Sequence, residues 1–376
     1  MQSFKFEVIH KSKKSRARVG KIYTPNGIID TPNFVGVGTN GAMKALDSKT
    51  VEDLGLQLMF ANTYHLMLQP GTKLIKAAGG IHKFMNRSTP IITDSGGFQV
   101  FSLAYGGIAE EIKSKGTKKG DNSVLKISEE GVLFRSYRNG EKILLTPETS
   151  IAAQKELGAN IMISFDELPP YHISEQKLLN SFNRTHRWEE RSLKAHLQNP
   201  NNQALYAVIH GGTNKELRKK SCEILSKMDF DGFAIGGSVG KNREEMVDML
   251  HFLLPHIPTD RPNHLLGIAD LPSLAQTIHL GIDTFDSAHP TKAARHGLLF
   301  TKQGPMRATQ HANNTSFLPI EEDCTCYTCK NYSRAYLCHL FKANELTAYT
   351  LATIHNLNHM IQLMKNYRNQ ILNNEL

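Results

Sequence analysis

The sequence predicts an α/β protein built as a (β/α)8 barrel, the TIM-barrel architecture, with insertions and a small carboxyl-terminal subdomain. Eight short apolar runs recur along the chain, each closing on polar or glycine residues, and segments of helical character separate most of them. A bare barrel needs about 250 residues, whereas this chain has 376, so insertions and an appendage are expected. The eight predicted strands are residues 33–39, 58–64, 90–96, 160–167, 204–210, 232–237, 264–269 and 284–289.

Helix signals lie between these runs. Pro147 stands at the start of one helical segment, where its missing backbone N–H costs nothing, and another segment is long, charged and amphipathic. Strands that alternate with helices are what the barrel requires. The predicted helices are 147–157, 174–197, 214–228, 243–254 and 344–365.

The composition indicates a globular chain with a sizeable core and no membrane span. Hydrophobic residues make up 40% and charged residues 21%, and no apolar run approaches the roughly 18 residues that a membrane-spanning helix needs. Residues 1–10 lack the apolar stretch of a secretory signal, so we expect a cytoplasmic protein, and residues 11–18 form a short basic surface run. The net charge of +9 is compatible with a nucleic-acid partner and does not prove one.

Two segments depart from the alternating pattern. Residues 105–126 are rich in glycine and lysine and have little periodicity, which predicts a mobile basic loop over the barrel mouth before a strand-like segment at 131–137. A solvated loop without a role is the commoner outcome for such a charge run. The second departure divides the chain: we expect residues 1–316 to form the barrel domain and 317–376 a subdomain packed on it.

Three of the five cysteines form a tight cluster, Cys324-Thr-Cys326-Tyr-Thr-Cys329. In a chain of this size, such spacing indicates a metal site and not a disulfide framework. Tetrahedral zinc takes four ligands, and His355 and His359, four residues apart on the following helix, are both candidates for the fourth. Three cysteines and one histidine leave no open coordination position, so the expected Zn2+ is structural and 317–376 is a zinc-binding subdomain.

Three of the predicted strands carry an aspartate at the end: Asp94, Asp166 and Asp286. Because the carboxyl ends of barrel strands meet at one mouth, we expect these carboxylates to converge. Two carboxylates beside a glycosidic bond can divide the work of exchange, one attacking the anomeric carbon and one handling the proton of the leaving group. Taken singly, each aspartate is just as readily a helix cap or an Asx turn.

The residues after Asp94 suit a planar ligand. Gly96 and Gly97 allow backbone amides to approach closely, and Phe98 offers a ring for stacking. An ordinary strand-to-loop turn has the same composition and is the alternative.

Beyond these features, the chain resembles the tRNA-guanine transglycosylases, or queuine tRNA-ribosyltransferases, of bacterial type from about residue 4 to about residue 363. Members of this family exchange a guanine of tRNA for a deazaguanine in queuosine modification. The resemblance implies an insertion-bearing barrel with a structural zinc, and it places the fourth zinc ligand on His355. The motifs that carry it are Asp30-Thr-Pro-Asn-Phe34, Asn62-Thr-Tyr-His-Leu66 with Pro70-Gly71, Asp94-Ser-Gly-Gly-Phe-Gln99, Ser164-Phe-Asp-Glu167, Gly232-Phe-Ala-Ile-Gly-Gly237, Phe285-Asp286 with Pro290-Thr291, and the cysteine cluster with His355-Asn-Leu357.

The resemblance assigns roles to the aspartates. It makes Asp286 the nucleophile that displaces the wobble guanine and holds the tRNA covalently, and Asp94 the acid/base that manages the proton of the leaving and entering bases. A double displacement of this kind retains the configuration of the sugar. Asp166 would accept hydrogen bonds from the nitrogens of the base, with backbone contacts from Gly236 and Gly237.

The resemblance also implies partners. Phe98 and Leu266 would sandwich the base, and Arg295 would contact the tRNA near the anticodon, although a solvated arginine is the alternative. The expected substrates are a tRNA with guanine at the wobble position of a GU(N) anticodon and a 7-deazaguanine base. The expected assembly is a homodimer.

Two positions depart from the family pattern. His210, still predicted to contact the base, stands where the family usually has glutamine, and an imidazole cannot reproduce the donor and acceptor pair of an amide. The loop after Gly237 is one residue shorter and ends in Lys241, in place of the glutamate that helps bacterial enzymes accommodate the cation of 7-aminomethyl-7-deazaguanine. We therefore hypothesise that the incoming base is not the usual bacterial 7-aminomethyl-7-deazaguanine, and that queuine, inserted directly, is a candidate for it. The alternative function is a catalytically inactive tRNA-binding or partner-subunit paralogue, against which the three aspartates argue.

Overall fold

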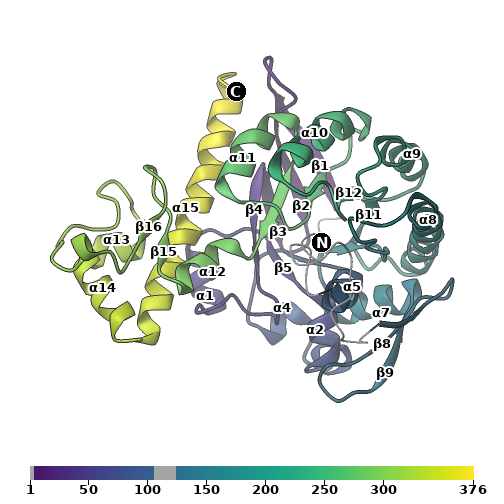
Figure 1. The fold of residues 1–376 in the computed structure, drawn as a ribbon, viewed down its shortest axis with the longest axis horizontal. Coiled ribbons are helices and arrows are strands. Elements are labelled where there is room, and N and C mark those ends of the chain that lie inside the picture. Colours follow the sequence, from purple (N-terminus) through teal and green to yellow (C-terminus); the bar gives the residue numbers. More distant parts are fainter. Residues whose placement is uncertain (1–3, 106–123) are drawn as a thin grey trace.

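The computed structural model describes residues 4–105 and 124–376, and at its centre lies a closed barrel of eight parallel strands (Figure 1). The strands follow one another around the barrel in chain order, and the last pairs with the first to close it. All eight predicted strands are confirmed, and most are shorter than the apolar runs that predicted them. They are β4 (Asn33–Val37), β5 (Met59–Ala61), β6 (Ile91–Thr93), β10 (Ile161–Ile163), β11 (Ala204–Ile209), β12 (Gly232–Ile235), β13 (Asn263–Leu265) and β14 (Thr284–Ser287).

Both faces of the barrel strands are buried. In β11, Tyr206 and Val208 belong to the cluster that fills the barrel, whereas Leu205 and Ala207 belong to the cluster shared with the surrounding helices. A strand buried on both sides is apolar at consecutive positions, which is why these strands stand out in the sequence as continuous runs.

Helices separate the strands and cover the outside of the barrel (Figure 1). The four helices predicted between barrel strands are confirmed, and the longest of them begins directly after Ser174. Pro147 occupies the first turn of its helix, behind a capping box at Thr146, as the sequence signal indicated. The helices of this part of the chain are α1 (Ser48–Asp53), α2 (Thr63–Leu68), α3 (Thr72–Ala77), α4 (Ile81–Phe84), α5 (Gly97–Tyr105), α7 (Pro147–Leu157), α8 (Glu175–Leu197), α9 (Lys215–Leu225), α10 (Arg243–Leu253), α11 (Leu271–Thr277) and α12 (His289–Arg295), with the short 3-10 turns η1 (Leu254–His256) and η2 (Ile278–Leu280).

An antiparallel sheet that the sequence did not predict precedes the barrel: β1 (Lys5–Lys11), β2 (Arg18–Thr24) and β3 (Gly27–Thr31). Ile22 and Ile29 of this sheet share the core cluster that fills the barrel. The sheet therefore packs against the interior of the barrel, and its apolar side chains complete that core.

Arg18 corrects the expectation of a basic surface run at residues 11–18. Its side chain is buried, and its Nε and Nη2 atoms donate to the two carboxylate oxygens of Asp283 at 2.9 Å and 2.5 Å. Nη1 also donates to the carbonyl of Thr259 at 2.6 Å. A bidentate pair with all these partners compensates for the desolvation of a guanidinium, which a charge count along the sequence cannot reveal.

A second antiparallel sheet follows α5, formed by β7 (Val124–Ile127), β8 (Val132–Arg135) and β9 (Lys142–Leu145). The strand-like segment predicted at 131–137 is confirmed. The basic loop predicted at 105–126 lies largely outside the described residues, and its last part is wrong as a loop, because residues 124–126 belong to β7. This sheet packs through Phe134 on the same cluster as Trp188 of α8.

The carboxyl-terminal part contains β15 (Leu298–Leu299), β16 (Met306–Arg307), η3 (His311–Asn313), α13 (Tyr327–Asn331), α14 (Arg334–Lys342) and the long α15 (Leu346–Leu372). In Figure 1, α13 and α14 project to one side of the barrel, and α15 runs between them and it. Leu351 and Ile354 of α15 pack with the cysteine segment, whereas Leu357, Met360 and Met364 join the main core. One helix thus ties the appendage to the barrel. No helix of the described residues is long and apolar enough to span a membrane.

Candidate active site and metal centre

The three predicted carboxylates lie at one end of the barrel. Asp94 directly follows β6, Asp166 lies just beyond β10, and Asp286 is near the end of β14. The carboxyl ends of parallel barrel strands share one rim. The segments of Asp94 and Asp166 also touch, because a Cβ atom on Gly97 would lie only 2.9 Å from the backbone oxygen of Asp166. The absence of a side chain at Gly97 is what allows this approach.

Four donors surround the Asp94 carboxylate. Oδ1 accepts from the backbone N–H groups of Thr63 at 2.8 Å and Gly96 at 3.2 Å. Oδ2 accepts from Asn62 Nδ2 at 2.6 Å and Gln99 Nε2 at 2.7 Å. Burial raises the pKa of Asp94, and these hydrogen bonds oppose the rise. A fixed carboxyl group with a raised pKa is a better proton acceptor than an exposed aspartate.

Asp286 is held through a single oxygen. Its Oδ1 accepts from the backbone N–H of Gly267 at 2.6 Å and lies 3.1 Å from Nε2 of the buried His264. The other imidazole nitrogen, Nδ1, lies 2.8 Å from the hydroxyl of Thr284. Between a carboxylate and a hydroxyl, the favoured neutral tautomer carries its proton on Nε2, donates to Asp286 and accepts from Thr284. Within the described residues Oδ2 has no hydrogen bond, so it is the oxygen available for chemistry.

Asp166 titrates far from its ordinary range. Burial raises its pKa to about 7; Glu167 and Asp94 add to the rise, and Arg218 opposes it. Near neutral pH this side chain can therefore act either as an acceptor-only carboxylate or, when protonated, as a donor.

Helix α8 holds the backbone that carries Asp166, and the sequence did not predict this. Beyond β10 the chain leaves the sheet, and the N–H groups of Phe165 and Glu167 donate to the hydroxyls of Ser192 at 3.3 Å and Thr185 at 3.1 Å. Polar residues on an amphipathic helix usually face solvent. Here the hydroxyls of Ser192 and Thr185 accept the backbone hydrogen bonds that a neighbouring strand would otherwise accept.

Glu189 of α8 makes hydrogen bonds to the residue after β10 and to the next strand, β11. Its Oε1 accepts from the backbone N–H of Val208 at 2.6 Å and from the hydroxyl of Ser164 at 3.1 Å, and its side chain is fully buried. Burial, opposed by these hydrogen bonds and reinforced by the charge of Asp166, raises the pKa of Glu189 well above its ordinary value. The raised pKa favours the protonated, neutral form of this carboxyl group.

Arg218 of α9 joins the loops that follow β11 and β12. Its fully buried guanidinium donates to the carbonyls of Ile209 at 2.6 Å, Gly212 at 2.8 Å and Ser238 at 3.2 Å. These bonds fix the loop that contains Gly237, a residue with a φ of +74°. The sequence offered no signal for this role, because Arg218 lies in an otherwise charged helix.

Of the other predicted base-binding residues, Gly236 and Leu266 lie together. A Cβ atom on Gly236 would be 2.9 Å from Leu266 Cδ1, so the backbone at Gly236 sits directly against that side chain. Phe98, in the first turn of α5, is 44% exposed and keeps ring surface available for a ligand.

His210 lies in a different setting. It is 1% exposed, its Nε2 atom is 3.4 Å from the hydroxyl of Ser181 in α8, and its backbone N–H donates to Ser221 in α9 at 3.0 Å. Burial and the nearby charge of Arg218 hold the pKa of His210 well below its ordinary value, so the ring is neutral.

Arg295, the predicted tRNA contact, is the last residue of α12. Its Nη1 atom donates to the carbonyl of Thr291 one turn earlier at 2.9 Å, and burial lowers its pKa. The side chain is half-buried and keeps further N–H groups to donate.

The three cysteines of the cluster lie around the side chain of His355. Nδ1 of His355 lies 3.8 Å from Cys324 Sγ, 3.7 Å from Cys326 Sγ and 3.4 Å from Cys329 Sγ, and the four ligand atoms lie within 4.8 Å of one another. Bonds of about 2.3 Å to sulfur and about 2.0 Å to nitrogen in a tetrahedron place ligand atoms at such separations. The donor set fits a zinc ion.

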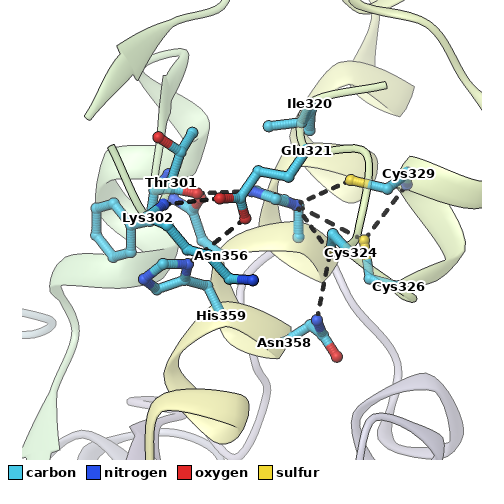
Figure 2. A network of polar contacts seen from close by, with 12 residues as sticks. Thr301, Lys302, Ile320, Glu321, Cys324, Cys326, Cys329, Asn356, Asn358 and His359 are labelled. Atoms are coloured by element: carbon cyan, nitrogen blue, oxygen red, sulfur yellow. Dashed lines mark hydrogen bonds and ion pairs between the residues drawn. The ribbon is translucent and has the colours of Figure 1, made fainter. Parts of the chain in front are cut away.

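Hydrogen bonds around the cluster orient its candidate metal ligands. His355 Nε2 donates to the carbonyl of Phe300 at 2.7 Å, which leaves Nδ1 unprotonated and free to bind a metal. Asn358 Nδ2 approaches Cys324 Sγ at 3.6 Å (Figure 2). His359, the other candidate ligand, lies outside the cluster with its Nδ1 atom 3.9 Å from Glu321.

The chain matches the family model described as Queuine tRNA-ribosyltransferase over residues 12–376. It is 64% identical over 371 residues to the queuine tRNA-ribosyltransferase of Protochlamydia amoebophila, a match that covers 99% of this chain and 96% of that protein. Over 375 residues it is 56% identical to the protein of the same name from Chlamydia felis and 50% identical to that from Chlamydia trachomatis serovar L2, with 100% of each chain covered. These matches span the barrel, its three carboxylates and the cysteine cluster, and the chain therefore belongs to the queuine tRNA-ribosyltransferase family.

Proposed function

We propose that this chain exchanges the guanine at the wobble position of GU(N)-anticodon tRNAs for a 7-deazaguanine base by double displacement. The observation that carries the proposal is the contrast between two carboxylates at one rim. Among the described residues, donors hold Asp286 through Oδ1 alone, whereas they hold Asp94 through both oxygens. The first arrangement suits a nucleophile and the second a fixed acid/base.

In the first step, Oδ2 of Asp286 forms a bond to C1′ of the ribose while the bond from C1′ to the base nitrogen breaks. The electron pair leaves with the base, and Asp94 in its acid form supplies the proton that the nitrogen takes up. In the second step, the nitrogen of the incoming base attacks C1′, Asp94 removes its proton, and the electron pair returns to the Asp286 carboxylate. Two inversions retain the configuration of the sugar.

Base recognition in this proposal falls to Asp166 and the loop after β12. Ionised Asp166 accepts hydrogen bonds from the ring and exocyclic nitrogens of the base, and Gly236 and Gly237 offer backbone groups. Phe98 and Leu266 supply apolar faces for the ring. His210 donates one hydrogen bond to the base.

Lys241 bears on the identity of the incoming base. Its Nζ atom pairs with Glu245 at 2.8 Å, and the same carboxylate accepts from the Lys241 backbone N–H and from the hydroxyl of Tyr171. The segment that would face the substituent of the base thus ends in a lysine whose charge Glu245 partly balances. Because this arrangement offers no dedicated carboxylate for an aminomethyl cation, we propose queuine as the base. Equal or tighter binding of 7-aminomethyl-7-deazaguanine in an equilibrium competition would refute this choice.

We also propose a domain organisation, a metal, a tRNA contact and an assembly for the whole chain. Residues 1–316 form the catalytic domain, and residues 317–376 form a subdomain in which Cys324, Cys326, Cys329 and His355 hold a structural Zn2+. Arg295 contacts the tRNA. Two chains form a homodimer, for which the exposed aromatic residues Phe317, Tyr327 and Tyr336 of the subdomain offer an apolar contact surface. A sedimentation mass of a single chain at micromolar concentration would contradict the dimer.

The central test is the entry of labelled guanine into a tRNA with a GU(N) anticodon. The wild type should incorporate label, and Asp286→Ala should abolish incorporation while it still binds tRNA. Asp94→Asn should slow exchange by two or more orders of magnitude, because general acid/base catalysis contributes about 100- to 10,000-fold. A chase with queuine or the aminomethyl base then reports the substrate. Binding of tRNA without any exchange by the wild type would favour the alternative of an inactive paralogue.

A further inference from the structure

Exposed aromatic and basic side chains gather on the hairpin between β8 and β9. Tyr137 at its tip is 52% exposed, and the guanidinium carbon of Arg138 lies 5.4 Å from the centre of the Tyr137 ring. A large aromatic side chain left half in water beside an arginine has a surface that a partner could cover.

Helix α2 connects this hairpin to the candidate active site through three consecutive residues. The N–H of Thr63 donates to Asp94 at 2.8 Å. The ring of the buried Tyr64 lies 6.0 Å from that of Tyr137 at an interplanar angle of 28°. His65 Nδ1 lies 3.2 Å from the Tyr137 hydroxyl. The exposed ring of Tyr137 is therefore linked to Asp94 through Thr63, Tyr64 and His65 of α2.

Positive charge accumulates around the same ring. The guanidinium of Arg138 lies over the Tyr137 ring, and burial, together with the positive charges of Arg138 and Lys44, lowers the pKa of His65. The one acidic residue of the hairpin tip, Glu141, accepts a hydrogen bond from Asn139 at 3.2 Å. The neighbourhood of Tyr137 therefore favours an anionic partner.

We propose that Tyr137, Arg138 and His65 form a binding surface for single-stranded RNA. An unpaired nucleotide stacks on Tyr137, and a neighbouring phosphate contacts the Arg138 guanidinium. Aromatic rings and guanidinium planes bind unpaired bases in this way with little sequence preference, and phosphate contacts fix the register of the strand. That the strand belongs to the anticodon loop whose guanine is exchanged rests on the proposed function.

The test measures binding of the full chain to an RNA stem-loop with a GU(N) anticodon by fluorescence anisotropy at several salt concentrations. Tyr137→Ala should weaken binding by about 5- to 100-fold, since stacking of one base is worth about 1–3 kcal/mol. Tyr137→Phe keeps the ring and should stay within about twofold. Arg138→Gln should reduce the slope of log affinity against log salt by about one.

Phe84→Ala, which removes an aromatic side chain of similar exposure elsewhere (44%, against 52% for Tyr137), is the matched control and should bind like the wild type. If Tyr137→Ala fails to fold by circular dichroism, Arg138→Gln decides the question, because its side chain is exposed. Wild-type affinity of Tyr137→Ala and an unchanged salt slope of Arg138→Gln would refute the proposed RNA-binding surface. Labelled-guanine exchange by the wild type tests the proposed function separately, so either proposal can fail while the other stands.

Discussion

His264 is the residue whose replacement should separate the orientation of Asp286 from the binding of substrates. His264→Phe keeps a ring that can stack on Phe60, whose centroid lies 5.9 Å away, and removes the donor to Asp286 Oδ1. A hydrogen bond to a charged group is worth about 1.5–3 kcal/mol. Single-turnover exchange should therefore slow by about 10- to 100-fold, with tRNA affinity and the KM for the base within about twofold.

His264→Gln is the control for this change. Its amide restores one N–H donor at a similar reach and should recover part of the lost rate. Equal losses in the glutamine and phenylalanine variants, or a loss confined to KM, would show that His264 only fills space beside Phe60.

At the scale of elements, α8 stabilises the strand ends through Glu189. Glu189→Gln keeps an acceptor for the Val208 N–H and should fold with wild-type stability near pH 5. Glu189→Leu leaves that buried N–H without a partner and should cost about 1–3 kcal/mol of unfolding free energy. Urea unfolding of both variants measures the difference, and a leucine variant as stable as the glutamine variant would contradict the role.

The raised pKa of Glu189 gives these variants a pH dependence. Between its ordinary value of 4.5 and the higher folded-state value, the folded chain holds a proton that the unfolded chain has lost. Unfolding free energy contributed by Glu189 therefore falls as pH rises through this window. Glu189→Gln has no such proton and should gain stability relative to the wild type as the pH rises above 4.5. A constant difference between the two unfolding curves across that range would contradict the shift.

The same elements show what sequence patterns can and cannot predict. Apolar runs predicted the barrel strands because both faces of each strand are buried, and the aspartates at their ends follow from strand direction. The groups that hold those aspartates were not predictable: Gly267 contributes a backbone N–H, and Asn62 becomes a donor only when its loop meets Asp94. The sheet at residues 5–31 was missed because β1 and β3 are only partly buried and the mostly buried β2 includes polar residues, so none of the three forms a continuous apolar run.

At the scale of the whole molecule, the Cys3His cluster, for which we propose a structural zinc, links the appendage to a helix that also belongs to the barrel core. The cysteines lie on the segment around α13, and His355 lies on α15, between Ile354 of the appendage cluster and Leu357 of the main core. If zinc occupies the cluster, its loss removes the bonds of this segment to α15 but leaves the apolar contacts of α15 with the barrel. The two parts should therefore respond differently to metal removal.

Purified chain should contain about one zinc per chain if the four ligands saturate one ion. Chelation, or Cys326→Ser, should speed amide hydrogen exchange in residues 317–345 and lower Tm, while strands β10 to β14 keep their protection. Guanine exchange should fall by less than about tenfold and recover when zinc returns, because a fully coordinated ion has no position for substrate. Cys222→Ala, which removes a buried thiol outside the cluster, should keep its zinc and its protection. Complete loss of guanine exchange with undiminished amide protection throughout would instead mean that the metal takes part in the chemistry.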